Sequence, residues 1–215
     1  MPRLILLAAW TLLPGIVALA ENAPDPNLDP SPSVAVFLDF DSTPGNSSLE
    51  IMKREVDGLL KPSGIHLDWK LVRDNDGRHA FPGLVVMKFK GRCRAENGSE
   101  PSREFGSLGE TFALGSTQVA NGHVLPYSEI ECDQVRKALA YLHPGADQLE
   151  RQHALGLALG RVVAHELYHI LARTTEHAAQ GLARASQSLR DLVNPEELGF
   201  LDADEDAIRK GGRAD

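Results

Sequence analysis

Residues 147–172 read DQLERQHALGLALGRVVAHELYHILA, and they predict the long helix around which the rest of the chain folds. Asp147, followed three residues later by Glu150, forms a capping-box pattern that predicts a helix start at Gln148. Helix-forming residues continue to about Ala172. Leucine, valine and alanine side chains occupy most faces of this helix, which indicates that it lies at the centre of the core.

Within this helix, His165-Glu166-Leu167-Tyr168-His169 matches the pattern H-E-x-x-H. Residues four apart lie one turn above each other on the same helix face, so both imidazoles can reach one metal ion. Glu166 lies about 100° round the helix axis from His165, where it can accept a proton from a water molecule at the metal. A shared metal also offsets the cost of burying these polar groups. The alternative interpretation is a pair of hydrogen-bonded core histidines with Glu166 as their partner.

A tetrahedral catalytic zinc site needs a third protein ligand, and His177 is the leading candidate. It follows His165 by twelve residues, which on an unbroken helix places it about 18 Å further along the axis. The chain must therefore fold back soon after Ala172, although no glycine is present there to supply the usual left-handed cap. Two alternatives stay open, a solvated His177 and a carboxylate ligand. The carboxylate candidates are Glu176, Glu196 and Glu197.

The residues before this helix predict a mostly parallel sheet. Alternating apolar residues predict strands over residues 34–40, 65–71 and 84–90. Ser47 with Glu50 predicts a capped helix that runs to Leu60 between the first two strands. The order strand, helix, strand implies a right-handed crossover and parallel pairing.

A hairpin is predicted next. Residues 111–120 and 123–131 are two strand-like runs on either side of Asn121-Gly122, the strongest short signal for a tight hairpin turn. One antiparallel strand is therefore expected at the sheet edge, followed by a short helix from Asp133 to about Leu142. The predicted fold is α+β, with a twisted five-stranded mostly parallel sheet, a crossover helix and the long central helix.

The amino-terminal segment predicts export. A basic start, an apolar run and Ala18-Leu19-Ala20 are typical of a signal peptide over residues 1–20. A proline-rich linker over residues 21–32 and one domain over residues 33–215 follow, in a secreted or periplasmic protein. There Cys93 and Cys132 can form a disulfide, although two unpaired buried thiols are the alternative.

The net charge of the chain restricts the classes of partner that it can bind. The formal net charge of −8, with no basic cluster, argues against a nucleic-acid-binding surface. After removal of the signal peptide, no membrane association is expected.

The segment from His165-Glu166-x-x-His169 to His177, followed by Gly181-Leu182-Ala183, resembles the zinc-binding region of metzincin-type metallopeptidases. It is similar to secreted bacterial members with an HExxHxxxxxxxH motif, and the predicted order of strands and helices over about residues 33–190 also fits that zincin-like fold. The resemblance implies a secreted zinc peptidase with His165, His169 and His177 as ligands and Glu166 as general base. It also implies a peptide or protein substrate that lies extended along the edge strand near residues 111–119.

The sequence departs from that family at three positions. Thr175 occupies the usual place of the third ligand, Arg173 replaces the glycine of the turn, and Ala183 replaces the methionine beneath the metal. The chain's three methionines are Met1, Met52 and Met87, so no methionine follows the motif. These departures keep open a non-catalytic binding module with the same fold, and a peptidase with a downstream glutamate as third ligand.

Overall fold

A computed structural model describes residues 33–95, 113–142, 145–188, 190–194 and 198–212. The described chain is α+β, with a five-stranded, mostly parallel sheet, one antiparallel edge strand and four α-helices. The fold class expected from the sequence is therefore confirmed at this level. The predicted signal peptide, residues 1–20, and the predicted linker, residues 21–32, lie outside the described residues.

The sheet has the strand order β2-β1-β3-β5-β4. Its strands are β1 (Ser33–Ser42), β2 (His66–Leu71), β3 (Leu84–Arg92), β4 (Gly115–Ala120) and β5 (His123–Glu131). The first strand pairs in parallel with both neighbours, β3 pairs in parallel with β5, and only β4 runs antiparallel. Because β4 is last in this order, one of its sides has no partner strand among the described residues.

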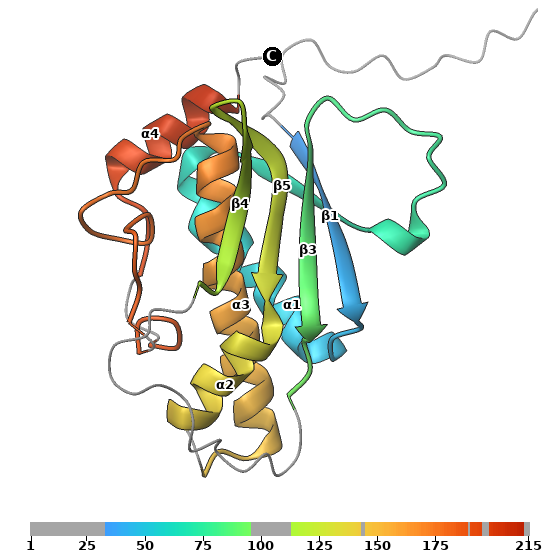
Figure 1. Cartoon of the computed structure of the whole chain (residues 1–215), viewed down its shortest axis with the longest axis vertical. Coiled ribbons are helices and arrows are strands. Elements are labelled where there is room, and N and C mark those ends of the chain that lie inside the picture. Colours follow the sequence, from blue (N-terminus) through green and yellow to red (C-terminus); the bar gives the residue numbers. More distant parts are fainter. Residues whose placement is uncertain (1–32, 96–112, 143–144, 189, 195–197, 213–215) are drawn as a thin grey trace, which may run out of the picture. The chain divides into compact units, whose positions relative to one another are not determined.

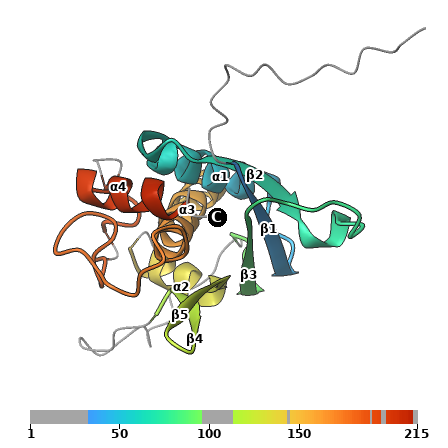
Figure 2. The same ribbon diagram turned by 90° about the horizontal axis from the view of Figure 1, so that it is seen from above.

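Two helices pack on the same side of the twisted sheet (Figures 1 and 2). The crossover helix α1 (Asn46–Leu60) lies against α3 (Gln148–Leu171), which carries the H-E-x-x-H residues. Figure 1 shows α2 (Cys132–Leu142) at the end of the sheet where β5 ends, and α4 (Asp202–Gly211) beside α3. The central position predicted for the long helix is confirmed, because most of its side chains between Leu155 and Leu171 are buried, whereas Leu149 in its first turn is exposed.

The core lies between the sheet and these helices. Strand residues that face the helices, such as Val36, Met87 and Ile130, are fully buried. On the opposite face of the sheet, the Lys88 ammonium group lies 3.1 Å from Asp39 and 2.7 Å from Asp41. The sheet therefore has one apolar face and one largely charged face, and the long helix is anchored on the apolar face.

Two local sequence signals are confirmed, the capping box at Asp147 and the hairpin turn at Asn121-Gly122. At the start of α3, Asp147 accepts from the Glu150 amide and Glu150 accepts from the Asp147 amide, which is the predicted capping box. In the hairpin, Asn121 and Gly122 have φ of 52° and 78°, as a type I′ turn requires.

The capping box predicted at Ser47 is wrong. The N-cap is Gly45, two residues earlier, so the helix begins at Asn46 with no side-chain capping bond. The Glu50 carboxylate instead pairs with Lys53 at 3.1 Å. Glycine is itself an acceptable N-cap, so the start of this helix does not need the serine hydroxyl.

Cys93 and Cys132 form a disulfide, with their Cα atoms 5.0 Å apart. It joins the chain just after β3 to the first residue of α2, and both cysteines are fully buried. Within the described ranges, none of the helices combines the length and apolar character needed to cross a bilayer.

Candidate metal centre

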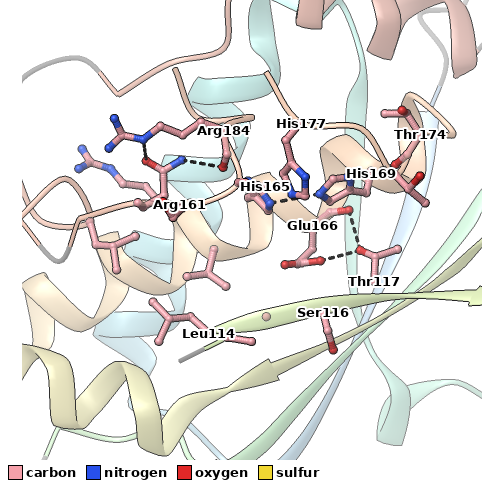
Figure 3. Close-up of a pocket in the computed structure, with 18 of the residues that line it drawn as sticks. Leu114, Ser116, Thr117, Arg161, His165, Glu166, His169, Thr174, His177 and Arg184 are labelled. Atoms are coloured by element: carbon pink, nitrogen blue, oxygen red, sulfur yellow. Dashed lines mark hydrogen bonds between the residues drawn. The ribbon is translucent and has the colours of Figure 1, made fainter. Parts of the chain in front are cut away.

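Three histidine side chains meet at the carboxyl-terminal end of α3 (Figure 3). His165 and His169 project from successive turns of the helix, and His177 approaches from the segment that follows. The Nε2 atoms of His165 and His169 are 3.2 Å apart, and one nitrogen from each of the three rings lies within 4.8 Å of the others. The His177 ring centroid is 5.4 Å from that of His165 and 4.7 Å from that of His169. The three histidines therefore lie close enough to bind one metal ion.

A sharp reversal of the chain after α3 brings His177 back to the helix. Arg173 has a φ of 53°, in the left-handed region that usually requires glycine. The Thr174 amide donates to the His169 carbonyl at 3.0 Å, and the Arg173 amide donates to the Ile170 carbonyl at 3.2 Å. These two bonds are those of a Schellman motif, formed here with arginine in the glycine position. The expected reversal between Ala172 and His177 is present, and no glycine is needed for it.

The hydrogen bonds of the two helical histidines direct their Nε2 lone pairs toward each other. His165 Nδ1 lies 2.8 Å from the Leu182 carbonyl oxygen, and His169 Nδ1 lies 2.8 Å from the Thr174 carbonyl oxygen. A carbonyl oxygen only accepts, so each Nδ1 must carry the proton, and in neutral rings both Nε2 atoms are then acceptors.

This arrangement suits a metal ion. Two lone pairs 3.2 Å apart repel each other unless a cation lies between them. Two nitrogens bound to one tetrahedral zinc ion at about 2.05 Å lie about 3.3 Å apart. The donor set and its hydrogen bonds are therefore compatible with a metal ion that binds imidazole, such as zinc.

The segment after His177 forms a partly buried loop that packs against the histidines. Leu182 and Ala183 are fully buried, and Gly181 turns the chain with a φ of 73°. The Ala178 amide donates to the Ala183 carbonyl at 3.0 Å, which closes the loop. The Leu182 carbonyl of this loop accepts from His165 Nδ1, so backbone groups support the helical histidine.

Burial shifts the pKa values of Glu166, His165 and His169. It raises the pKa of the Glu166 carboxyl to about 7, partly opposed by the hydrogen bond from Thr117. It lowers the pKa of His169 to about 4 and also lowers the pKa of His165. Neutral imidazoles are the form that binds a metal, so the buried histidines stay competent for binding in mildly acidic solution.

The Glu166 side chain lies between α3 and the edge strand β4. The Thr117 hydroxyl is 2.6 Å from Glu166 Oε2 (Figure 3). It is also 2.7 Å from the Ser128 hydroxyl. Gly115, on the same face of β4, passes so close that a Cβ atom there would lie 2.7 Å from Glu166 Oε1. Sequence reasoning did not identify Thr117, Ser128 or Gly115, because they meet Glu166 only through the pairing of distant segments.

A cavity of about 770 Å³ opens beside the three histidines. Its walls are β4, the face of α3 that carries Glu166, and residues 184–188. Arg161, one turn before His165, belongs to the wall and is held by Glu55 Oε1 at 2.8 Å. The site therefore has room for a bound molecule between the edge strand and the histidines.

Of the alternative carboxylate ligands, Glu176 lies in the described structure and does not join the cluster. Glu176 is exposed, and the metal-binding group consists of His165, His169 and His177. Glu196 and Glu197 lie outside the described residues.

Comparison with protein-family models, with curated proteins and with solved structures finds no significant match for this chain.

Proposed function

We propose that this chain is a secreted zinc-dependent peptidase of the metzincin type, with His165, His169 and His177 as zinc ligands and Glu166 as general base. The observation that carries the proposal is the pair of Nε2 lone pairs 3.2 Å apart, with a third imidazole beside them. Core histidines that only satisfied each other would share a proton between these atoms. Here both protons are used by backbone carbonyls, which argues for an external cation.

The residues around the histidines support hydrolysis rather than metal storage. When bound, a zinc ion supplies a Lewis acid that polarises a carbonyl group and lowers the pKa of water. Glu166 is 5% exposed, and its carboxylate lines the same cavity as the histidines. Its pKa of about 7 is suited to accepting a proton from attacking water near neutral pH and returning it to the leaving amine.

The edge strand supports a peptide substrate. The side of β4 that faces away from β5 has no partner strand among the described residues, and Gly115, Ser116, Thr117 and Val119 line the cavity. An extended peptide can add to such an edge through backbone hydrogen bonds, with its scissile carbonyl near the histidines. The buried disulfide agrees with a secreted or periplasmic location, since disulfides persist in oxidising compartments.

The decisive experiment is the substitution Glu166→Gln. Purified protein is expected to contain one zinc ion per chain and to hydrolyse an unstructured protein substrate. The variant should keep its zinc and lose roughly 100-fold or more in kcat, because a general base contributes about 10²–10⁴-fold. Glu50→Gln, an exposed substitution on α1, is the matched control and should retain full activity.

The non-catalytic binding module is the competing function, and the same experiment separates the two. It is favoured if wild-type protein binds one zinc ion per chain and hydrolyses no peptide bond in a broad peptide library. Zinc content that stays unchanged in a His165→Ala/His169→Ala variant would reject both functions.

The third ligand needs its own comparison. Removal of a direct ligand should weaken zinc binding by roughly 100-fold or more, since loss of a supporting residue alone costs about 10–100-fold. We expect this loss in His177→Ala and not in Glu196→Ala, with affinity measured by competition with a chelator. The reverse result would assign the third position to the glutamate.

A further inference from the structure

We propose that Thr117 is a positioning residue for Glu166, holding its Oε2 atom so that Oε1 faces the substrate cavity. This inference rests on the proposed peptidase function and adds a residue on β4 to it. The contact is short and shielded, because Thr117 Oγ1 lies 2.6 Å from Glu166 Oε2 and Glu166 is 5% exposed. It joins the edge strand directly to the helix that carries the histidines.

Hydrogen-bond donors and acceptors fix the direction of this contact. The Ser128 hydroxyl is fully buried, and its hydrogen-bond partner in the described structure is Thr117, at 2.7 Å. Thr117 Oγ1 also lies 3.3 Å from the Glu166 carbonyl oxygen, but its contact with Oε2 is much shorter. A carboxylate only accepts, so Thr117 donates its single hydroxyl proton to Oε2 when Glu166 is ionised. Ser128 then donates to Thr117. The three groups form a chain of donors that ends on the carboxylate.

The pairing of β4 with β5 determines where these hydrogen-bonded hydroxyl groups lie. Thr117 and Ser128 are direct cross-strand partners of β4 and β5, and the register of the pairing shifts between Thr117 and Val119. Both hydroxyls lie on the sheet face that packs against α3, where Glu166 is also located. The position of Thr117 is therefore determined by the sheet and not by a mobile loop.

Gly115 provides the space for the other carboxylate oxygen. A Cβ atom at Gly115 would lie 2.7 Å from Glu166 Oε1, 2.9 Å from Val162 Cγ1 and 3.0 Å from Glu166 Cγ. Among the residues that the structure describes, none donates a hydrogen bond to Oε1. One oxygen is thus fixed by Thr117, and the other remains available to water in the cavity.

This arrangement has a chemical consequence. A glutamate has three side-chain torsions, and a displacement of the reacting group by about 1 Å can cost about 100-fold in rate. Loss of the Thr117 hydroxyl should therefore reduce the rate of the chemical step. Substrate affinity and zinc content should change little, because the hydroxyl bonds to Glu166 and Ser128 and not to the histidines, and a peptide added to β4 would bind its backbone.

The test compares Thr117→Val with Thr117→Ser. Valine keeps the size and branching of threonine without the donor, whereas serine keeps the donor. We expect Thr117→Val to lower kcat by roughly 10–100-fold, with KM within about 3-fold of wild type and one zinc ion per chain. Thr117→Ser should restore kcat to within about 3-fold of wild type. Equal losses in both variants, or a change confined to KM, would overturn the proposal.

A second measurement decides whether the contact exists without relying on activity. Melting temperatures of the zinc-free protein are compared for Thr117→Val, Glu166→Ala and the double variant, as in a double-mutant cycle. If the two residues are coupled, Thr117→Val lowers the melting temperature by a few degrees in the wild-type background and by clearly less in the Glu166→Ala background. Additive shifts would refute the contact. An inactive wild type would refute the peptidase function, and the cycle would still show whether Thr117 holds Glu166.

Discussion

Arg173 adopts a backbone conformation that is less favourable in free energy for most residues than for glycine. Its φ of 53° lies in the left-handed region, where a side chain costs about 1–2 kcal/mol relative to glycine. The chain accepts this cost at the turn that returns His177 to the helix. The turn also directs the Thr174 carbonyl onto His169 Nδ1. The strain is therefore located at the turn that brings His177 to the other two histidines.

We predict that Arg173→Gly is more stable than Arg173→Ala by about 1 kcal/mol. Both substitutions remove the same side-chain interactions, so their difference isolates the backbone conformation. Urea unfolding of the zinc-free proteins measures the difference as a shift in midpoint at constant slope. Equal midpoints would show that residue 173 does not hold the left-handed conformation in solution.

The pKa of Glu166 predicts a pH dependence of stability. Burial raises this pKa from 4.5 to about 7, so the folded state holds the proton more tightly than the unfolded state. The stabilisation from this group is complete below about pH 4.5 and is lost as the pH rises through 7, by about 3 kcal/mol in total. His169 acts in the opposite sense, because burial lowers its pKa to about 4. Its contribution is lost as the pH falls from 6.5 to 4.

Glu166→Gln separates the two contributions. The free energy of unfolding of zinc-free wild type minus that of the variant should fall by about 3 kcal/mol between pH 4.5 and pH 8. The contribution of His169 is present in both proteins and cancels in this difference. A difference that does not vary with pH would mean that the carboxyl group is solvated in the folded protein.

Among individual residues, the sequence predicted the members of the site that lie close together along the chain. His165, Glu166 and His169 share one helix, so their relative positions follow from helix geometry alone. The reversal that returns His177 was inferred only as a requirement of the site, because an arginine with positive φ gives no sequence signal. Thr117 could not be inferred, since it reaches Glu166 across 49 residues of sequence.

At the scale of secondary-structure elements, two glycines control how closely α3 approaches α1. A Cβ atom at Gly156 would lie 2.6 Å from Ile51 Cβ and 2.9 Å from the Ser48 carbonyl oxygen. One turn later, a Cβ atom at Gly160 would lie 2.7 Å from Glu55 Cβ. The helices are therefore in contact through backbone on the α3 side, which also holds Arg161 beside Glu55.

We predict opposite effects for two glycine substitutions in these helices. Gly156→Ala should destabilise the protein by about 1–3 kcal/mol, because the helices must move apart. Gly58→Ala in α1 should stabilise it by about 1 kcal/mol, because the new methyl group meets no atom within 4 Å and alanine favours helix. Thermal unfolding of both variants measures the two signs, and a stabilising Gly156→Ala would contradict the close crossing.

Most elements were predictable from the sequence because their signals are local. Alternating apolar residues gave the strands, and Asn121-Gly122 gave the hairpin with its two positive φ angles. The start of α1 was wrong because two acceptable N-caps compete, and Gly45 is used instead of Ser47. The close crossing of α1 and α3 was not predicted, since a glycine in a helix does not reveal which neighbour it faces.

At the scale of the whole domain, the sheet order explains how the site is assembled from distant parts. The crossover of α1 places β2 beside β1, the chain then returns to place β3 on the other side of β1, and the hairpin places β4 beside β5 at the sheet edge. This order brings the face of β4 that carries Thr117 against the helix that carries Glu166. Sequence reasoning reached the edge strand and the central helix, but the contact between them depends on how the two pack.

The disulfide divides the domain into parts with different roles. Cys93 and Cys132 are separated by 39 residues, and the segment between them includes the whole β4–β5 hairpin. The three histidines, in contrast, lie between residues 165 and 177, outside that segment. The disulfide thus restrains β4, whose Thr117 contacts Glu166, and the three histidines lie in a separate part of the chain.

We therefore predict that Cys93→Ala/Cys132→Ala loses stability and retains zinc. A crosslink that closes about 40 residues contributes about 4 kcal/mol on the chain-entropy account, which corresponds to roughly 8–16 °C in melting temperature for a domain of this size. Zinc stoichiometry measured well below the melting temperature should stay at one per chain, because the ligands and their supporting carbonyls lie outside the closed segment. A reductant should lower the melting temperature of wild type by a similar amount and leave the variant unchanged. Loss of zinc from the folded variant would show that the hairpin and the histidines form one cooperative unit, contrary to the separation argued from the fold.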